Sequence, residues 1–274
     1  MSATPLVLGH RDGAAGGLGD VWHEVDSLAW LPVAPRIVVQ VGGGGDRALA
    51  TETARSLVEF LETRRVADVE IVDADRVPAA SLRVGCVTSP GELVVPADWF
   101  ESHALVTIAA AAPCTTARLA AGLDAQAEAL RRLGNPHAPS DLVYEAHRLA
   151  ASDLVVVCGR ADFGVADSAA WWAVGADAVA VDATVVAAAG GVPDALPWLR
   201  ALARHQTLPA PAVLRGSLPD IRGHLAGAWR SRRHAVGARL SASVAAVQRD
   251  ARMLRHNVHR IPNFVRRRLA RREA

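Results

Sequence analysis

The sequence predicts a three-layer α/β fold, in which helices cover both faces of a mainly parallel sheet. Short apolar runs of strand length alternate along the chain with segments whose apolar residues recur at helical spacing. With 274 residues, of which 51% are hydrophobic, the chain is long enough to bury one large core. We therefore predict an α/β domain over residues 1–214 and a basic helical extension over residues 215–274.

The chain begins with a predicted short strand, Pro5–Leu8, and a glycine-rich turn, Asp12–Asp20. We interpret the turn as a loop rather than a phosphate cradle, because no strand is expected to run directly into it and no clear helix start follows. His23, beside Glu24 and Asp26, is interpreted as a surface residue.

A strand, a loop and a helix are predicted next. Ile37–Val41 is typical of a buried strand, four glycines interrupt the run, and apolar residues recur at helical spacing from Leu49 to Leu61. A second strand, Val69–Val72, follows the helix and ends at Asp73.

The loop of this unit is a candidate ligand site. Backbone N–H groups of a glycine loop can approach an anion at the start of a helix, and an acid after the next strand can hold a ribose hydroxyl. Asp73 is that acid, although it lies twenty-five residues after Ala48, where about twenty are expected. The alternative is a flexible loop over the strand ends. The candidate loop residues are Gly42, Gly43, Gly44, Gly45 and Asp46, of which Gly43 and Gly45 fit, with Ala48, the pattern G-x-G-x-x-A.

The middle of the chain predicts further strands and helices. Ser81–Phe100 contains two strand-like runs around a Ser-Pro-Gly turn, and Ala104–Ala110 is the next buried strand. A helix is predicted over Ala117–Leu133, with Thr115 or Thr116 as its N-cap.

Another candidate residue follows the next buried strand. Asp141–Ala151 is a predicted helix, and Leu154–Cys158 is a buried strand after which Asp162 stands. Ligands of open α/β sheets bind at the carboxyl ends of the strands. We therefore expect Asp162, Asp73 and the glycine loop to share one edge of the sheet. An amphipathic helix over residues 193–205 completes the predicted domain.

Two aspartates interrupt the nearly continuous apolar segment Trp171–Gly191. Asp177 and Asp182 are five residues apart, so on a helix they would point about 140° away from each other. We predict that Asp177 caps the start of a buried helix. Asp182 is then a buried carboxylate, which requires either a structural partner or a ligand. We favour the structural partner and keep both residues as ligand-site candidates.

The segment Gly175–Asp182 resembles the conserved D-x-V-A-x-D-A segment of the family catalogued as domain of unknown function 362. In that family a small-residue helix and a glycine follow this segment, as they do here. The resemblance extends over Pro35–His205 and implies a small-ligand-binding protein. Further segments that occur in the family's order are Arg36–Val41, Thr51–Arg64, Ala67–Asp75, Leu93–Pro96 and Ala104–Ile108.

This chain departs from that family in two respects. Many members carry iron–sulfur clusters, which need a dense run of cysteines such as C-x-x-C-x-x-C-x-x-x-C-P. The three cysteines here, Cys86, Cys114 and Cys158, are widely spaced, so the resemblance implies a member without a cluster. Family members also place a lysine and a histidine after the buried middle strand, where this chain has Ala111–Thr116.

Composition excludes several kinds of chemistry. The chain has no lysine, which excludes a Schiff-base lysine and a phosphate-loop lysine. No C-x-x-C is present, so a zinc ribbon is disfavoured and no metal site is predicted. We identify no catalytic constellation and no specific cofactor. No apolar run of about 18 residues is free of charge and proline, and the first residues do not resemble a signal peptide, so we expect a cytoplasmic protein.

Charge is distributed unevenly along the chain. Residues 215–274 carry fifteen arginines against three acids, a net charge of +12, whereas residues 1–214 carry fifteen arginines against twenty-five acids, a net charge of −10. Apolar residues recur at steps of three and four from Val244 to Val265, and Pro262 should break this predicted helix near Ile261. Three partners are considered for this stripe: the domain itself or a second copy, an anionic membrane at its inner face, and, least favoured, nucleic acid.

The leading functional prediction is a small-ligand-binding protein of the domain of unknown function 362 type, without an iron–sulfur cluster. Its basic tail, residues 219–274, would associate with the membrane surface or with a protein partner, including a second copy. The alternative is an enzyme that binds a nucleotide-type cofactor, NAD or S-adenosylmethionine, at Gly42–Asp46, with Asp73 on the ribose.

Overall fold

The structure is a computed structural model that describes residues 5–11, 18–31, 34–64, 68–74, 76, 78–114, 118–162, 168–193, 197–205 and 212–221. The described strands are β1 (Leu6–Arg11), β2 (Arg36–Gly42), β3 (Asp68–Asp73), β4 (Ser81–Gly85), β5 (Glu92–Pro96), β6 (Ala104–Ala110), β7 (Ala112–Cys114), β8 (Arg118–Ala120), β9 (Leu154–Arg160), β10 (Ala170–Gly175) and β11 (Val213–Gly216). The described helices are α1 (Leu18–Ser27), α2 (Arg47–Thr63), α3 (Asp98–Glu101), α4 (Gly122–Arg132), α5 (Pro139–Leu149), α6 (Ala178–Ala188) and α7 (Pro197–His205).

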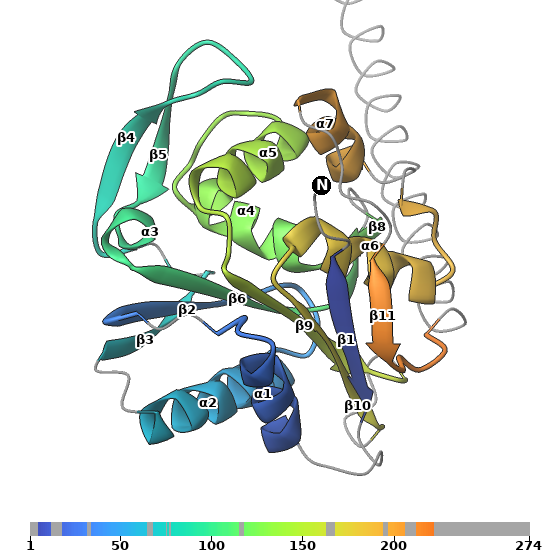
Figure 1. The fold of residues 1–274 in the computed structure, drawn as a ribbon. Coiled ribbons are helices and arrows are strands. Elements are labelled where there is room, and N and C mark those ends of the chain that lie inside the picture. The colour runs from blue at the N-terminus through green and yellow to red at the C-terminus, as the bar shows by residue number, and fades with distance from the viewer. Residues whose placement is uncertain are drawn as a thin grey trace, which may run out of the picture. The chain divides into compact units, whose positions relative to one another are not determined.

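The main sheet is mixed but mostly parallel. Seven of the described strands form it, in the order β11-β1-β10-β9-β6-β2-β3 (Figure 1). Among these strands only β10 runs opposite to its neighbours, since it pairs antiparallel with both β1 and β9. The other strands therefore end at the same side of the sheet. We call this side the carboxyl edge and define it by the strand ends at Gly42, Asp73, Ala110 and Arg160.

Helices cover both faces of this sheet, which confirms the predicted α/β fold (Figure 1). Helices α1 and α2 pack on one face, in a core that includes Trp22 and Leu57. Helices α4 to α7 pack on the other face, where Leu123, Val181 and Leu202 belong to a second core. A strand between two such layers must be apolar on both sides, and all seven residues of β6 are buried.

The direction of the connections reverses between β2 and β6. From β2, the chain crosses one face through α2 and reaches β3. From β6, it crosses the opposite face through α4 and α5 and reaches β9, on the other side. The loops that leave these two neighbouring strands therefore turn to opposite faces. This is the topological switch point at which open α/β sheets bind their ligands.

The start of α4 differs from the prediction. The helix predicted over Ala117–Leu133 begins at Gly122, because Arg118–Ala120 pairs with β7 in a short hairpin. Thr115 and Thr116 lie outside the described residues, and the N-cap of the observed helix is Ala121, which provides no side-chain hydrogen bond. The prediction failed because three residues with an apolar pattern fit a strand as well as a helix.

The start of the chain also differs. Strand β1 continues to Arg11, and α1 begins at Leu18, so a strand and a helix flank the glycine-rich turn that we interpreted as having neither. Residues 12–17 of that turn lie outside the described residues. His23 is exposed, as predicted, and its ring meets that of Phe60 edge-on at a centroid distance of 5.0 Å.

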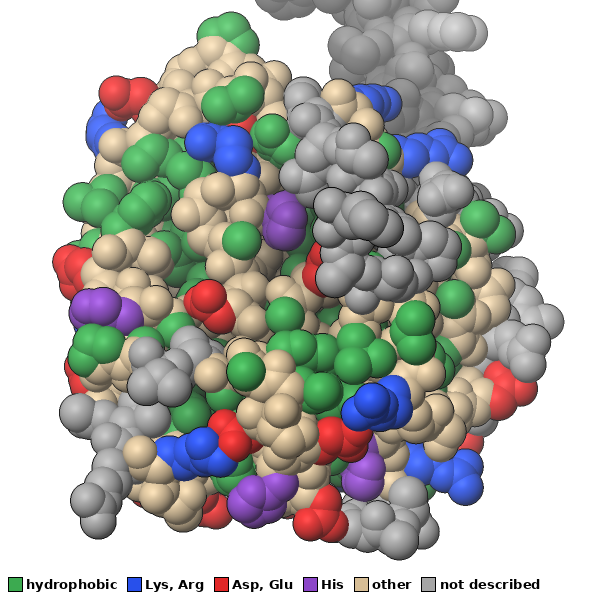
Figure 2. Space-filling view, in the orientation of Figure 1, with side chains coloured by type: hydrophobic (Ala, Val, Ile, Leu, Met, Phe, Trp, Pro, Cys, Tyr) green, Lys and Arg blue, Asp and Glu red, His purple; other side chains and the backbone are tan. Residues whose placement is uncertain are grey.

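The two strands predicted within Ser81–Phe100 form the β4–β5 hairpin, which pairs with no other described strand (Figure 1). Leu82 and Val87 are exposed on it, and Figure 2 shows hydrophobic side chains over this part of the surface. A two-stranded sheet is marginally stable by itself, so the hairpin depends on contacts with the helices behind it.

Glu145 of α5 is a buried polar anchor of the hairpin. Its side chain is fully buried, and its Oε1 accepts the N–H groups of Val87 and Thr88, each at 2.7 Å. Its Oε2 accepts a bond from Nη2 of Arg148 at 2.7 Å. Burial raises the pKa of Glu145, but these donors and the Cys86 thiol outweigh it and hold that pKa below its usual value.

The domain continues past the predicted boundary at residue 214. Strand β11 spans that boundary and pairs parallel with β1, and Ile221 is buried in the core. The chain divides into two compact units, Met1–Trp229 and Arg230–Ala274. The predicted helical extension beyond Ile221 lies outside the described residues. Within the described part of the chain, no helix has the length and apolar content that a membrane span requires.

We expect Glu145→Ala to lower the free energy of unfolding by about 3 kcal/mol, because the N–H groups of Val87 and Thr88 and the guanidinium of Arg148 lose a buried charged acceptor. Glu92→Ala is the control: it removes the exposed partner of Arg83 in the same hairpin and should change stability by less than about 0.5 kcal/mol. Urea unfolding measures both variants. Equal losses would contradict the anchoring role of Glu145.

The lowered pKa also sets a direction for pH. Stability from the Glu145 carboxylate is present above its usual pKa of 4.5 and is lost as pH falls through its lower folded pKa. In the same unfolding series, Glu145→Gln should therefore lose less stability than the parent protein between pH 5 and strongly acidic conditions.

Candidate functional site

The glycine loop after β2 lies against the backbone of β6. A Cβ atom on Gly43 would lie 2.4 Å from the carbonyl oxygen of Ala110, and one on Gly45 would lie 2.1 Å from that of Ala111. Gly43 also has a φ of 98°, which side chains disfavour. These two glycines are therefore required by the close approach of the loop to the end of β6, whether or not a ligand binds.

The other two glycines of the loop have different surroundings. A Cβ atom on Gly42 would lie 3.1 Å from the Cβ atoms of Ala74 and Ala125, so Gly42 fits between the end of β3 and helix α4. Gly44 is exposed, and a Cβ atom there would lie 3.5 Å from that of Ala112, an ordinary contact. Gly44 is thus a glycine that packing does not require.

Asp46 is the N-cap of α2 and also reaches the end of β9. Its Oδ1 accepts the N–H of Leu49 at 3.0 Å, and its Oδ2 accepts a bond from Nε of Arg160 at 2.8 Å. Burial raises the pKa of Asp46, but Arg160 and the N–H groups of Leu49 and Ala48 together lower it by more. The pKa of Asp46 is therefore below its usual value. The carboxylate is therefore ionised and engaged on both sides.

The next residue reaches the opposite flank. Arg47 forms an ion pair with Asp73, which lies at the end of β3, and Nε of Arg76 is 3.8 Å from the same carboxylate. The adjacent residues Asp46 and Arg47 thus pair with the ends of β9 and β3, the two strands that flank β6 and β2. We call the two pairs, Asp46–Arg160 and Arg47–Asp73, the edge clasp.

Asp162 lies at the same edge, as predicted. Its N–H donates to Oγ of Ser168 at 3.1 Å, and that hydroxyl donates to the carbonyl of Asp162 at 3.2 Å. Arg160 donates from Nη1 to the carbonyl of Ser168 at 2.9 Å. The guanidinium of Arg160 therefore joins the β9–β10 connection to the edge clasp, and the glycine loop, Asp73 and Asp162 all lie along the carboxyl edge.

Asp177 lies at the opposite edge of the sheet. Strand β10 is reversed, so its last residue, Gly175, pairs with Val155 near the start of β9. Asp177 follows there and caps α6, accepting the N–H of Ala180 at 3.0 Å, which confirms the predicted capping role. The structure does not bring Asp177 to the glycine loop.

Asp182 lies on α6 and has a structural partner. The residue is fully buried on α6, and its two oxygens accept the N–H groups of Gly122 and Leu123. The donors belong to the first turn of α4. Of the two partners considered for this carboxylate, the structure shows the structural one.

Sequence reasoning missed the two arginines of the edge clasp, Arg47 and Arg160. Arg47 directly follows Asp46, and Arg160 lies two residues before Asp162, both of which the sequence singled out. The signal that the sequence offered was the short distance along the chain between each arginine and a candidate residue. An arginine at a strand end is common on surfaces, however, and its partner is set by contacts between distant segments.

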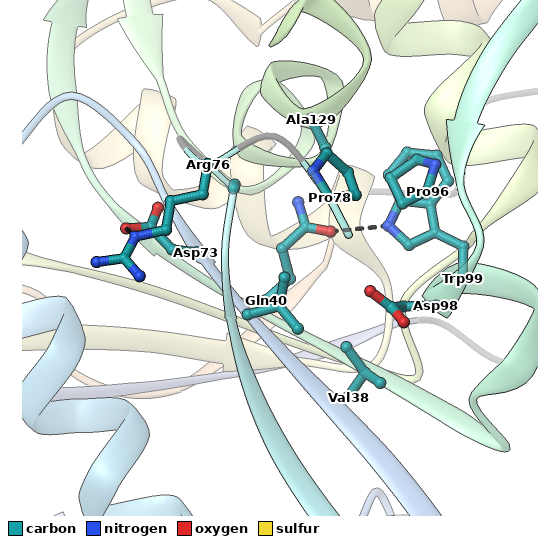
Figure 3. A pocket seen from close by; sticks show the side chains of 11 residues that line it. Val38, Gln40, Asp73, Arg76, Pro78, Pro96, Asp98, Trp99 and Ala129 are labelled. Atoms are coloured by element: carbon teal, nitrogen blue, oxygen red, sulfur yellow. Dashed lines mark hydrogen bonds and ion pairs between the residues drawn. The ribbon is translucent and has the colours of Figure 1, made fainter. Parts of the chain in front are cut away.

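A small hollow lies beside the clasp, on the α4 side of β2 and β3 (Figure 3). Asp73 and Arg76 border it, and its floor contains Gln40, whose Oε1 accepts a bond from Nε1 of Trp99 at 2.9 Å. Gln40 also donates to the carbonyl of Ala125 at 3.1 Å. The volume of about 10 Å³ holds one water molecule, so this hollow is not a pocket for a larger ligand.

The described residues do not fit an iron–sulfur cluster. Cys158 is buried within β9, where burial raises the pKa of its thiol to about 12, and Cys86 stands apart at the hairpin turn. A cluster needs several thiolates close together. Among the described residues, no group of three or more histidines, cysteines and acids is arranged to hold a metal ion.

Comparisons of the chain with protein-family models, with curated proteins and with solved structures find no match. The kinship with the domain of unknown function 362 family therefore stays a prediction from the sequence.

We expect Gly45→Ala to lower the free energy of unfolding by about 2 kcal/mol, because the new methyl group overlaps the carbonyl of Ala111. Gly44→Ala, in the same loop, is the matched control and should change stability by less than about 0.5 kcal/mol. Urea unfolding of both variants measures the difference. If the two variants were equally stable, the loop would not lie against β6 as described.

Proposed function

We propose that this protein binds a small polar ligand at the carboxyl edge, as a protein of the domain of unknown function 362 type without an iron–sulfur cluster. One observation carries the proposal: the loop Gly42–Asp46 leaves β2 at the switch point between β2 and β6, and ion pairs join it to Asp73 at the end of β3 and to Arg160 at the end of β9, the strand that Asp162 follows. Open α/β sheets use this position to bind ligands because neighbouring loops diverge from it.

The free donors at this edge favour a ligand with acceptor oxygens. No hydrogen bond within the described chain uses the N–H groups of Gly44 or Gly45, and both residues are accessible to solvent. Arg160 contributes a guanidinium beside them, of which Nε and Nη1 are engaged. The carboxylates of Asp46 and Asp73 are already paired with arginines, so they orient donors rather than take the ligand.

A nucleotide cofactor, NAD or S-adenosylmethionine, is the second candidate. The order strand, glycine loop, helix, strand and acid favours it, and in the structure β2 and β3 are parallel neighbours, as such a unit requires. Two observations weigh against it. The ionised Asp46 occupies the start of α2, where a phosphate would bind, and Arg47 holds the carboxylate that would bind the ribose.

The ligand proposal is tested by native mass spectrometry of the purified full-length protein and by equilibrium dialysis against NAD, S-adenosylmethionine and inorganic phosphate. We expect a co-purified, non-nucleotide small molecule. Gly44→Leu should lower its affinity by about tenfold or more, because the added side chain covers the donors of the loop while packing tolerates a Cβ there. Asp177→Ala, at the opposite edge, is the control and should leave binding unchanged.

Other outcomes decide between the candidates. Saturable binding of NAD or S-adenosylmethionine that is lost in Asp73→Asn would establish the second candidate instead. Absence of any co-purified molecule and of saturable binding to all three probes would remove both.

The second part of the proposal concerns the basic tail, residues 219–274. Nearly all of this tail lies outside the described residues, so the proposal rests on the charge of the tail. We propose that its arginines hold the protein to an anionic surface, the inner face of the membrane, in a cytoplasmic protein. A protein partner, including a second copy, is the other occupant considered, and nucleic acid is the least favoured.

We expect the full-length protein to sediment with vesicles containing anionic lipid at low salt, and deletion of residues 230–274 to abolish this. The cut is placed after Trp229 because Ile221 belongs to the core of the first unit. Neutral vesicles are the control, and added salt should weaken binding. Full-length protein that stays in the supernatant at low salt would contradict the membrane proposal.

A further inference from the structure

A serine and a histidine form a short hydrogen bond at the turn of the β4–β5 hairpin. Oγ of Ser89, in the turn, lies 2.6 Å from Nδ1 of His137, which belongs to the segment between α4 and α5 (Figure 1). The two residues are 48 positions apart in the chain, so no local pattern connects them. A hydroxyl group within hydrogen-bond distance of an imidazole is the arrangement by which a serine is activated as a nucleophile.

Neighbouring groups direct the hydroxyl proton of Ser89 toward the histidine. On the other side of its Oγ lies Sγ of Cys86, at 3.4 Å, and this thiol donates to Oε1 of Glu145 at 3.2 Å. The thiol proton therefore faces the carboxylate, and sulfur is only a weak acceptor for the hydroxyl group. Nε2 of His137 is buried and forms no hydrogen bond within the described chain. Nδ1 is thus the nitrogen through which His137 can accept the proton of Ser89 as a general base.

The hairpin is held in place by other contacts. Glu145 accepts two N–H groups of the turn, and Asn135 binds both the N–H and the carbonyl group of Val94, each at 2.8 Å. These bonds already join the hairpin to α5 and to the segment after α4. Anchoring of the hairpin therefore does not require the pairing of Ser89 with His137.

Ser89 is accessible, and unused donors lie beside it along the chain. Ser89 is partly exposed, Gly91 is exposed, and a Cβ atom on Gly91 would meet no atom within 4 Å, so a substrate can approach over this glycine. No hydrogen bond within the described chain uses the N–H groups of Ser89 or Gly91. Backbone N–H groups at and near a nucleophilic serine stabilise the oxyanion that forms when an acyl carbon is attacked.

We propose that Ser89 and His137 form a catalytic pair that hydrolyses small esters. Nδ1 of His137 takes the hydroxyl proton as Oγ of Ser89 bonds to the acyl carbon, and it returns this proton to the leaving alkoxide as the C–O bond of the ester breaks. His137 then takes a proton from water, the hydroxide attacks the acyl carbon, and Oγ leaves with the proton. The products are an alcohol and a carboxylic acid, and water is the only second reactant.

The open position of the turn sets the kind of ester. An exposed turn makes few contacts with a substrate, so reactivity depends on the ester itself, and we expect small, activated esters to react. Val87, in the same turn, is 61% exposed and offers an apolar surface to the acyl group. The pair lies outside the edge clasp, so this activity is independent of ligand binding at the carboxyl edge.

The test uses the full-length protein and a fluorophosphonate probe, which bonds covalently to activated serine hydroxyl groups. Peptide mapping by mass spectrometry should find the probe on Ser89 and not on Ser81, an exposed serine at the start of β4. His137→Ala should lower the rate of labelling about a hundredfold or more, because the general base is lost. His103→Ala removes an exposed histidine elsewhere, and as the control it should leave this rate unchanged.

Hydrolysis of 4-nitrophenyl acetate gives a second readout and should fall to the background rate in Ser89→Ala. The proposal is overturned if Ser89 of the parent protein is not labelled, or if it is labelled equally fast in protein unfolded by urea. Neither result needs a variant to fold. Labelling at the parent rate in His137→Ala would also overturn it.

Discussion

The close approach of the glycine loop to the end of β6 is the constraint on which the carboxyl edge depends. Because Gly43 and Gly45 lack side chains, the loop lies directly on the carbonyl groups of Ala110 and Ala111. Helix α2 then starts above the strand ends, and its first residues reach neighbouring strands on both sides. With a larger residue at either glycine, the loop would lift and the edge clasp would lose its geometry.

Two aspartates in this structure perform the same local task under opposite electrostatic conditions. Asp46 and Asp182 each accept backbone N–H groups at the start of a helix. Asp46 is partly exposed and pairs with Arg160, so its pKa is lowered. Asp182 is fully buried and pairs with no cation among the described residues, so its pKa is raised. The surroundings, rather than the capping geometry, therefore decide which carboxylate holds its charge at neutral pH.

Much of the architecture was predictable from local patterns. Apolar runs of strand length and helical periodicity predicted the layers, and the glycines after β2 were placed correctly between a strand and a helix. The shared edge of Asp73 and Asp162 followed from one rule, that parallel strands end on the same side. The start of α4, the end of β1 and the start of α1 were predicted wrongly, because short segments with few apolar residues carry little periodicity.

The sequence by itself thus determined the fold class, the cap at Asp177 and the residues gathered at the carboxyl edge, since each depends on spacing along the chain. Tertiary structure alone decided three other features. The reversed direction of β10 placed Asp177 at the far edge, Asp182 received the start of α4 as its partner, and Arg160 was paired with Asp46. Each depends on contacts between segments far apart in the chain, and periodicity, which is a local property, contains no information about which distant segments meet.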